Sequence, residues 1–205
     1  GRSAWDVWRN GGQITINGEE VTGIGHQQLL DTIRGLGANN ICIAGGLNWA
    51  FDVSGLADGY DGLEHGYRLT DTPEGNGVMY DSHAYPVKGA KDSWDKTIGP
   101  VREVAPILIG EWGWDESDKA ISGGDCTADI WMNQLMNWMD DTYGNYDGVP
   151  VNWTGWNLHM SSSPRMIDSW DFKTTAYNGT YIKERLQSYN NQPKTYDGVY
   201  KTDFS

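Results

Sequence analysis

Polar side chains stand where short apolar segments of the sequence end, and their types are those of a catalytic site. His83 and Tyr85 close the segment 77–85, and their equal parity along an extended chain points both to one side. Glu111 follows the uncharged residues 106–110. A carboxylate at the end of an apolar strand loses solvation free energy and needs a partner, so we expect Tyr85 to donate a hydrogen bond to it.

A third apolar segment, 150–156, ends in Trp156. Taken singly, each residue has an ordinary explanation, because strand ends often carry a capping glutamate, a structural histidine or a core tryptophan. The combination of His-x-Tyr, Glu and Trp on consecutive strand ends favours an active site. In barrel enzymes the C-terminal ends of the strands build that site.

The aromatic composition points to a carbohydrate ligand. The chain has 11 Trp and 11 Tyr against 3 Phe. Such side chains suit surfaces that are partly apolar and partly wet, and indole rings stack on the C–H faces of pyranose sugars. Most of these aromatic residues still have an ordinary place in the core or at its rim.

Charge excludes other partners. The 205 residues include 15 Lys and Arg against 28 Asp and Glu, a formal charge of −13. Binding of nucleic acid needs clustered cations, and an anionic membrane repels an acidic surface. The apolar runs are far shorter than the ~20 residues of a spanning helix. We therefore expect neither nucleic acid nor a membrane as partner.

We also expect no metal and no cofactor. Cys42 and Cys126 form no metal motif, and nothing supports a disulfide between them. The acidic loop 115–118, with Asp125, has oxygen ligands that suit Ca²⁺, but its spacing fits no calcium loop, so solvation explains it better. The triplet at Asn178 matches the N-glycosylation pattern.

The elements that must position these residues alternate between helix and strand. Buried strands in such an order predict parallel pairing with helical crossovers. Four strands of this kind make either a small doubly wound sheet or half of a (β/α)8 barrel, which needs ~250 residues. The expected elements are a hairpin at 13–18 with its turn at Asn17-Gly18, strands at 40–45, 77–85, 106–111 and 150–156, and helices at 26–34, 94–105, 127–143 and 179–188.

Helical periodicity places the apolar residues of two of these helices. Leu29, Leu30 and Ile33 fall on one face of the first of these helices, and Ile182 and Leu186 point inward from the last.

The ordered motifs resemble glycoside hydrolase family 5, the retaining cellulases and their relatives. The resemblance rests on His-Ala-Tyr at 83–85, Ile-Gly-Glu-Trp-Gly at 109–113 and Trp-Thr-Gly-Trp at 153–156. The segments 48–54 and 164–170 are similar to the same group. The resemblance runs from about Trp5 to Gln187 and matches strands five to eight of the family's barrel.

Carried over residue by residue, the resemblance implies a role for each position. Glu111 would be the nucleophile, Tyr85 would orient it, and His83 would line the subsite of the sugar being cleaved. Trp156 would be the floor on which that sugar stacks. Two further substrate-binding candidates are Trp49, at a neighbouring subsite, and Trp112, which could be a platform or a packing residue.

One element of the family pattern is absent. The family carries its acid/base glutamate in an Asn-Glu-Pro motif, and this sequence contains none. We therefore expect an α/β fold that is a partial (β/α)8 TIM barrel, a half-barrel fragment formed by residues 1–190 with a C-terminal tail at 191–205. Its partner would be an N-terminal half-barrel, and the chain alone would be a weak or inactive enzyme.

The resemblance implies part of a secreted, endo-acting cellulase that cleaves β-1,4-glucan with retention of configuration. Activity on β-mannan or xyloglucan stays open, because loop detail selects the substrate. So do a non-catalytic glucan-binding module, which would not need Glu111, and a doubly wound domain of unrelated function.

Overall fold

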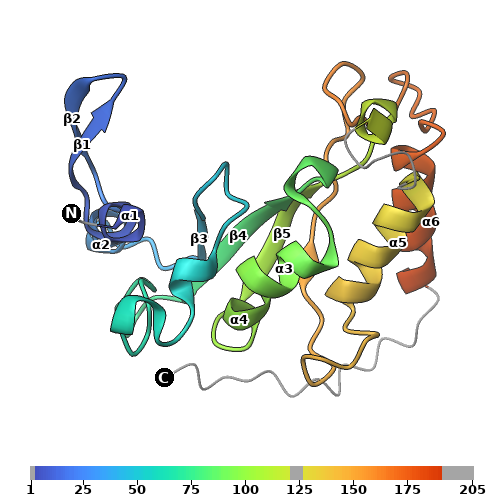
Figure 1. The fold of residues 1–205 in the computed structure, drawn as a ribbon. Helices are drawn as coiled ribbons and strands as arrows, with labels where there is room; N and C mark the ends of the chain where they lie inside the picture. The colour runs from blue at the N-terminus through green and yellow to red at the C-terminus, as the bar shows by residue number, and fades with distance from the viewer. Residues whose placement is uncertain (1–2, 121–126, 191–205) are drawn as a thin grey trace. The chain divides into compact units, whose positions relative to one another are not determined.

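The computed structural model describes residues 3–120 and 127–190. The chain divides into two compact units, 1–82 with 95–108 and 83–94 with 109–205 (Figure 1). The expected boundary between 190 and 191 and the tail beyond it lie outside the described residues, as do Cys126 and Asp125.

The first unit begins with helix α1 (Ala4–Asn10) and a hairpin of β1 (Gly12–Ile16) and β2 (Glu19–Gly23). The two strands pair antiparallel, from Gly12 opposite Gly23 to Ile16 opposite Glu19. Asn17 and Gly18 both have positive φ, 52° and 87°. That backbone twist matches the twist of paired strands, so the expected turn is confirmed.

Helix α2 (His26–Gly35) follows, and only part of its predicted apolar face is buried. Leu30 is 3% exposed, but Leu29 and Ile33 are 46% and 38% exposed. Of the three apolar residues, only Leu30 therefore contributes to the core. Periodicity locates a stripe on a helix but not the width of the surface that covers it.

Strands β3 (Cys42–Gly45) and β4 (Val78–Ala84) pair in parallel, with Cys42 opposite Val78 and Gly45 opposite Asp81. The loop between them carries two short 3-10 turns, η1 (Ser54–Leu56) and η2 (Tyr60–Gly62). Both strands lie within the segments that the sequence predicts.

The expected helix at 94–105 is two shorter helices, α3 (Lys91–Thr97) and α4 (Gly99–Arg102). Pro100 explains the break, because it has no N–H to continue the hydrogen bonds of α3. In the first turn of α4 the missing N–H costs nothing. A 3-10 turn, η3 (Pro86–Lys88), precedes α3.

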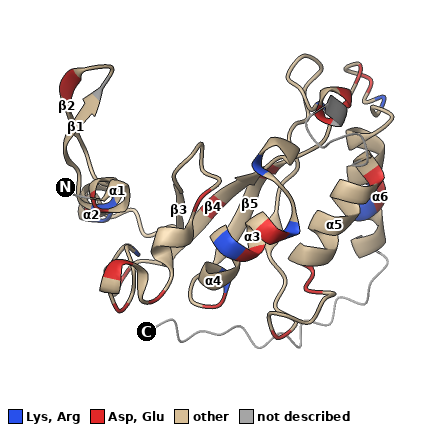
Figure 2. Ribbon diagram, viewed as in Figure 1, with Lys and Arg blue, Asp and Glu red and all other residues tan. Residues whose placement is uncertain are grey.

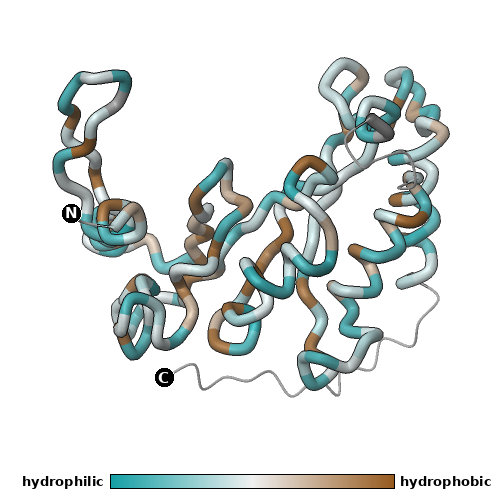
Figure 3. Tube along the Cα trace, in the orientation of Figure 1, coloured by the Kyte–Doolittle hydropathy of each residue, from teal (hydrophilic) through white to brown (hydrophobic). Residues whose placement is uncertain are grey.

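Strand β5 (Ile107–Trp112) begins in the first unit and ends in the second. In the second unit it is followed by η4 (Glu116–Ala120), α5 (Ala128–Met139), β6 (Asn152–Trp153) and α6 (Asn178–Asn190). The strand expected at 150–156 is thus only two residues long. Figure 2 shows charged residues on helices, on loops and on strand β2, and Figure 3 shows apolar residues along β3 and β5.

Helices α5 and α6 lie side by side (Figure 1), and the hydroxyl of Tyr181 donates to Asn133 over 2.7 Å. Ile182 is 3% exposed and reaches Gly155, where an added Cβ would stand 2.6 Å from its Cδ1. Leu186, one turn farther, is 50% exposed, so its predicted inward position is wrong.

In the described part of the chain the larger sheet has the strand order β3-β4-β5-β6. The expected α/β class with parallel strands and helical connections is confirmed. Among the described residues, the search for a helix long and apolar enough to cross a bilayer finds none.

Candidate functional site

The ends of β4 and β5 bring three predicted site residues together within the second unit. The hydroxyl of Tyr85 donates to Oε2 of Glu111 over 2.9 Å, which confirms the expected hydrogen bond. Nδ1 of His83 lies 3.3 Å from the same oxygen. The side chains of His83 and Glu111 are 24% and 25% exposed, so a ligand can still reach the carboxylate.

Burial and the neighbouring Glu111 carboxylate both raise the pKa of Tyr85 well above its usual value. The phenol therefore stays protonated at any ordinary pH and keeps its role as a donor. A phenol that keeps its proton can hold and orient the Glu111 carboxylate by this hydrogen bond.

Trp156 lies beside β5 through backbone contacts. The N–H of Trp156 donates to the carbonyl of Trp112 over 2.9 Å, and the N–H of Thr154 donates to Ile109 over 2.9 Å. The alignment begun by β6 thus continues to residue 156. The half-buried Trp156 is consequently held next to the strand that carries Glu111.

The two other substrate-binding candidates have different surroundings. Trp112 is fully buried, and its ring contacts the rings of Trp153 and Tyr181 edge to face. Of the two roles considered for Trp112, a sugar platform or a packing residue, its burial favours packing. Trp49 belongs to the first unit, where it is 84% exposed with a positive φ of 55°.

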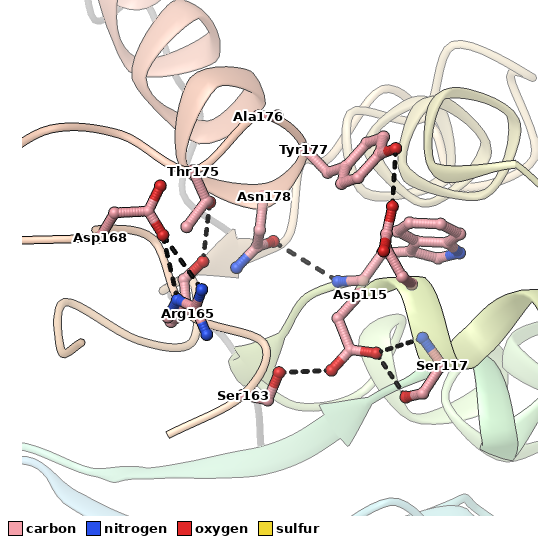
Figure 4. Close-up of a pocket in the computed structure, with 11 residues that line it drawn as sticks. Asp115, Ser117, Ser163, Arg165, Asp168, Thr175, Ala176, Tyr177 and Asn178 are labelled. Carbon is pink, nitrogen blue, oxygen red and sulfur yellow. Dashed lines mark hydrogen bonds and ion pairs between the residues drawn. The ribbon is translucent and has the colours of Figure 1, made fainter. Parts of the chain in front are cut away.

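A cavity of about 450 Å³ opens among the segments that follow β5 and β6 (Figure 4). Sequence reasoning did not identify it. Its lining residues are those of 114–117, Ser163, Arg165, Asp168 and 175–178. Glu111 is not among them, but Trp114 follows Glu111 closely and Asn178 donates to the carbonyl of Trp156. The cavity therefore adjoins the segments that carry the catalytic candidates.

Polar groups around the cavity pair with one another. The carboxylate of Asp115 accepts hydrogen bonds from the backbone N–H of Ser117, at 2.8 Å, and from the hydroxyl of Ser163. Tyr177 donates to Glu116 over 3.0 Å, and Arg165 pairs with Asp168 at 3.1 Å. Figure 4 shows these contacts around the cavity wall.

Burial would raise the pKa of Asp115, but the hydrogen bonds from Ser117 and Ser163 outweigh it and lower that pKa. Its carboxylate thus organises the loop through protein contacts. Within residues 3–120 and 127–190, no group of His, Cys, Asp and Glu has the arrangement of a metal site. Asp125, the other member of the acidic loop, falls in the gap between those ranges.

Besides the cavity, sequence reasoning did not identify Asn178 as part of this region. It is 2% exposed, and its amide contacts Trp114, Trp156 and Pro164. A side chain this enclosed cannot carry a glycan in the folded protein, despite the matching triplet.

Comparison with known proteins identifies relatives of this chain. The model of the family Cellulase (glycosyl hydrolase family 5) matches residues 10–162. An endoglucanase from Clostridium saccharobutylicum is 22% identical over 175 residues, which are 82% of this chain and 34% of that protein. The chain thus spans about a third of the length of this curated relative.

Solved structures share the fold. A β-glucanase from Saccharophagus degradans in complex with cellotetraose has a TM-score of 0.58 at 23% identity, over 80% of this chain and 46% of that one. An endo-β-1,4-glucanase from Xanthomonas axonopodis pv. citri has a TM-score of 0.54 at 17% identity, over 78% and 52%. The family match over residues 10–162 shows that the chain belongs to glycosyl hydrolase family 5, the cellulase family.

Proposed function

We propose that this chain carries the nucleophile side of a retaining, endo-acting β-1,4-glucanase. The observation that carries the proposal is the contact of Tyr85 and His83 with one oxygen of Glu111. Family membership supports it, because it assigns the chain to cellulases on independent grounds.

In the proposed mechanism Glu111 attacks the anomeric carbon and forms a glycosyl ester while the glycosidic C–O bond breaks. A second carboxyl group, ~5–5.5 Å from the nucleophile in retaining enzymes, protonates the departing oxygen. That group then takes a proton from water, which displaces Glu111 with overall retention. Tyr85 orients the attacking carboxylate, His83 lines the subsite, and Trp156 supports the sugar ring.

The motif that carries the second carboxyl group in this family is missing from this chain. Asn-Glu-Pro occurs nowhere in the 205 residues. We infer that residues outside the chain provide it, in an N-terminal half-barrel that completes the fold. The share of the relatives' length that the chain spans, 34% to 52% in the comparisons above, supports this inference.

The substrate we propose is β-1,4-glucan. The curated relative is an endoglucanase, and the structural relatives include one solved with cellotetraose and one solved with cellopentaose. β-Mannan and xyloglucan are the alternatives to test beside it. Because a polysaccharide does not cross a bilayer, we propose that the complete protein acts outside the cell.

A substrate with a good leaving group tests the nucleophile without the acid. Dinitrophenyl β-cellobioside needs no protonation of its departing oxygen, so the chain should release a burst of about one dinitrophenolate per molecule. Slow turnover should follow, because water attack lacks its base. Cellotetraose, which needs the acid, should be cleaved weakly or not at all. The Glu111→Gln variant should show no burst.

The second candidate is a non-catalytic glucan-binding module, which the aromatic content favours. It predicts binding of cellotetraose with no burst, equal in the wild type and in Glu111→Gln. Efficient cleavage of cellotetraose by the wild type, lost in Glu111→Gln, would instead show that this chain contains its own acid.

A further inference from the structure

A single buried amide joins the segments that follow β5 and β6. Nδ2 of Asn178 donates to the carbonyl of Trp156 over 2.6 Å and to that of Pro164 over 3.0 Å. Its Oδ1 accepts the backbone N–H of Trp114 at 3.4 Å. Figure 4 shows Asn178 at the start of α6, beside the cavity.

Two of these partners are backbone groups in the segments that carry Trp156 and Glu111. Trp156 carries the indole proposed as the sugar platform, and Trp114 stands three residues after Glu111. The N–H of Trp156 also donates to Trp112, so residue 156 is held on both its amide and its carbonyl. The backbone sets the Cα–Cβ direction of residue 156, so these contacts limit where its indole ring can lie.

Packing around the amide leaves little freedom for it to move. An added Cβ at Gly113 would stand 2.6 Å from Cγ of Pro164 and 3.1 Å from both polar atoms of the Asn178 amide. A glycine two residues after Glu111 thus permits this close approach. The paired polar groups of the neighbouring cavity wall support the same segments.

We propose that Asn178 is a positioning residue for catalysis, which sets the place of the Trp156 indole relative to the carboxylate of Glu111. The inference rests on the proposed function. Only an amide supplies, at this one place, both donors to the carbonyls of Trp156 and Pro164 and an acceptor for Trp114. Asn178 does not touch the sugar and acts through Trp156.

The first test does not depend on activity. The chain is labelled with 5-fluorotryptophan, and the resonance of Trp156 is assigned with Trp156→Phe. Asn178→Asp keeps the shape of the side chain but replaces both donors by an acceptor. It should move or broaden the Trp156 signal. If Asn178→Asp fails to fold, the milder Asn178→Ser takes its place and should change the signal to a smaller extent.

A matched control separates positioning from general damage. Asp141 is 6% exposed and accepts backbone N–H groups of Asn145, Tyr146 and Gly148 at 2.7–2.9 Å. Asp141→Asn is an equally small change at a buried hydrogen-bonding site of the same unit. It should leave the Trp156 signal in place. An unchanged signal in a folded Asn178 variant would overturn the proposal.

The second test is a double-mutant cycle on the second-order rate of the dinitrophenolate burst. Asn178→Asp should lower this rate by on the order of tenfold to a hundredfold, since a shift of ~1 Å can cost ~10²-fold. Combined with Trp156→Ala it should add nothing, because the indole through which Asn178 acts is gone. Additive losses would overturn the proposal. If the wild type shows no burst, the proposed function fails and the fluorine spectra still decide the role of Asn178.

Discussion

Tyr85 and Glu111 come from neighbouring strand ends, and the phenol of one donates to the carboxylate of the other over 2.9 Å. The phenol is held protonated, because burial and the carboxylate raise the pKa of Tyr85. Tyr85 is therefore a fixed hydrogen-bond donor to Glu111.

Tyr85→Phe removes the donor and keeps the ring. We expect the burst rate with dinitrophenyl β-cellobioside to fall about ten- to hundredfold, since a hydrogen bond to a charged group contributes ~1.5–3 kcal/mol. Binding of cellotetraose, measured by calorimetry, should change little. Tyr181→Phe is the control, because that phenol donates to Asn133 between two helices. Equal losses in both variants would mean that the Tyr85 hydroxyl has no special role.

A comparison of Trp112 and Trp49 tests the difference between a buried and an exposed tryptophan. Trp112 is 0% exposed and Trp49 is 84% exposed. We expect Trp112→Ala to lower the free energy of unfolding by about 3–5 kcal/mol, as for other buried aromatic truncations. The same change at Trp49 should stay within about 0.5 kcal/mol. Urea denaturation measures both, and similar values for the two variants would contradict the assignment of Trp112 to the core.

The ion pair of Arg34 and Asp71 makes stability depend on pH. Nε of Arg34 lies 2.7 Å from Oδ1 of Asp71, with side chains 2% and 15% exposed. The Arg34 hydrogen bond lowers the pKa of Asp71 in the fold. A carboxyl group with a depressed folded pKa stabilises the protein above its unfolded pKa of ~3.9, and this contribution disappears as pH falls through the folded value.

Asp71→Asn should therefore lower the midpoint of thermal unfolding by several degrees at neutral pH, with the difference from wild type shrinking below pH 4. Asp58→Asn is the matched control, since Asp58 is 53% exposed in its pair with Arg68 and should matter little. A deficit of constant size down to acid pH would mean that the charge of Asp71 is not the cause.

Gly18 and Gly35 test the strain of the β1–β2 turn. Neither has a neighbour within 4 Å of an added Cβ, so Gly→Ala is sterically free at both. Gly18 has a φ of 87°, whereas Gly35 ends helix α2. We expect Gly18→Ala to destabilise by about 1–2 kcal/mol and Gly35→Ala to be neutral or slightly stabilising. The opposite order in chemical denaturation would contradict the turn geometry.

Local signals in the sequence were enough for much of the fold. Asn17-Gly18 predicted the hairpin, and the uncharged run before Glu111 predicted β5. The break at Pro100 was also visible, although the prediction continued the helix through it. Burial was harder to predict, because Leu29 and Leu186 depend on which surfaces other segments present.

The site divides in the same way. His83, Tyr85 and Glu111 could be predicted because each ends a recognisable strand. Asn178 could not, since its partners Pro164, Trp156 and Trp114 lie 14, 22 and 64 residues away. No local pattern encodes such contacts.

Covalent trapping tests the central claim most directly. The chain is incubated with 2-deoxy-2-fluoro-β-cellobiosyl fluoride, whose leaving group needs no acid and whose ester hydrolyses slowly. Intact mass and peptide mapping should show one fluorocellobiosyl group per chain, on Glu111, with slower labelling in excess cellotetraose. Glu111→Gln should remain unlabelled. An adduct on another residue, or no adduct in a chain that binds cellotetraose, would contradict the assignment of Glu111 as the nucleophile.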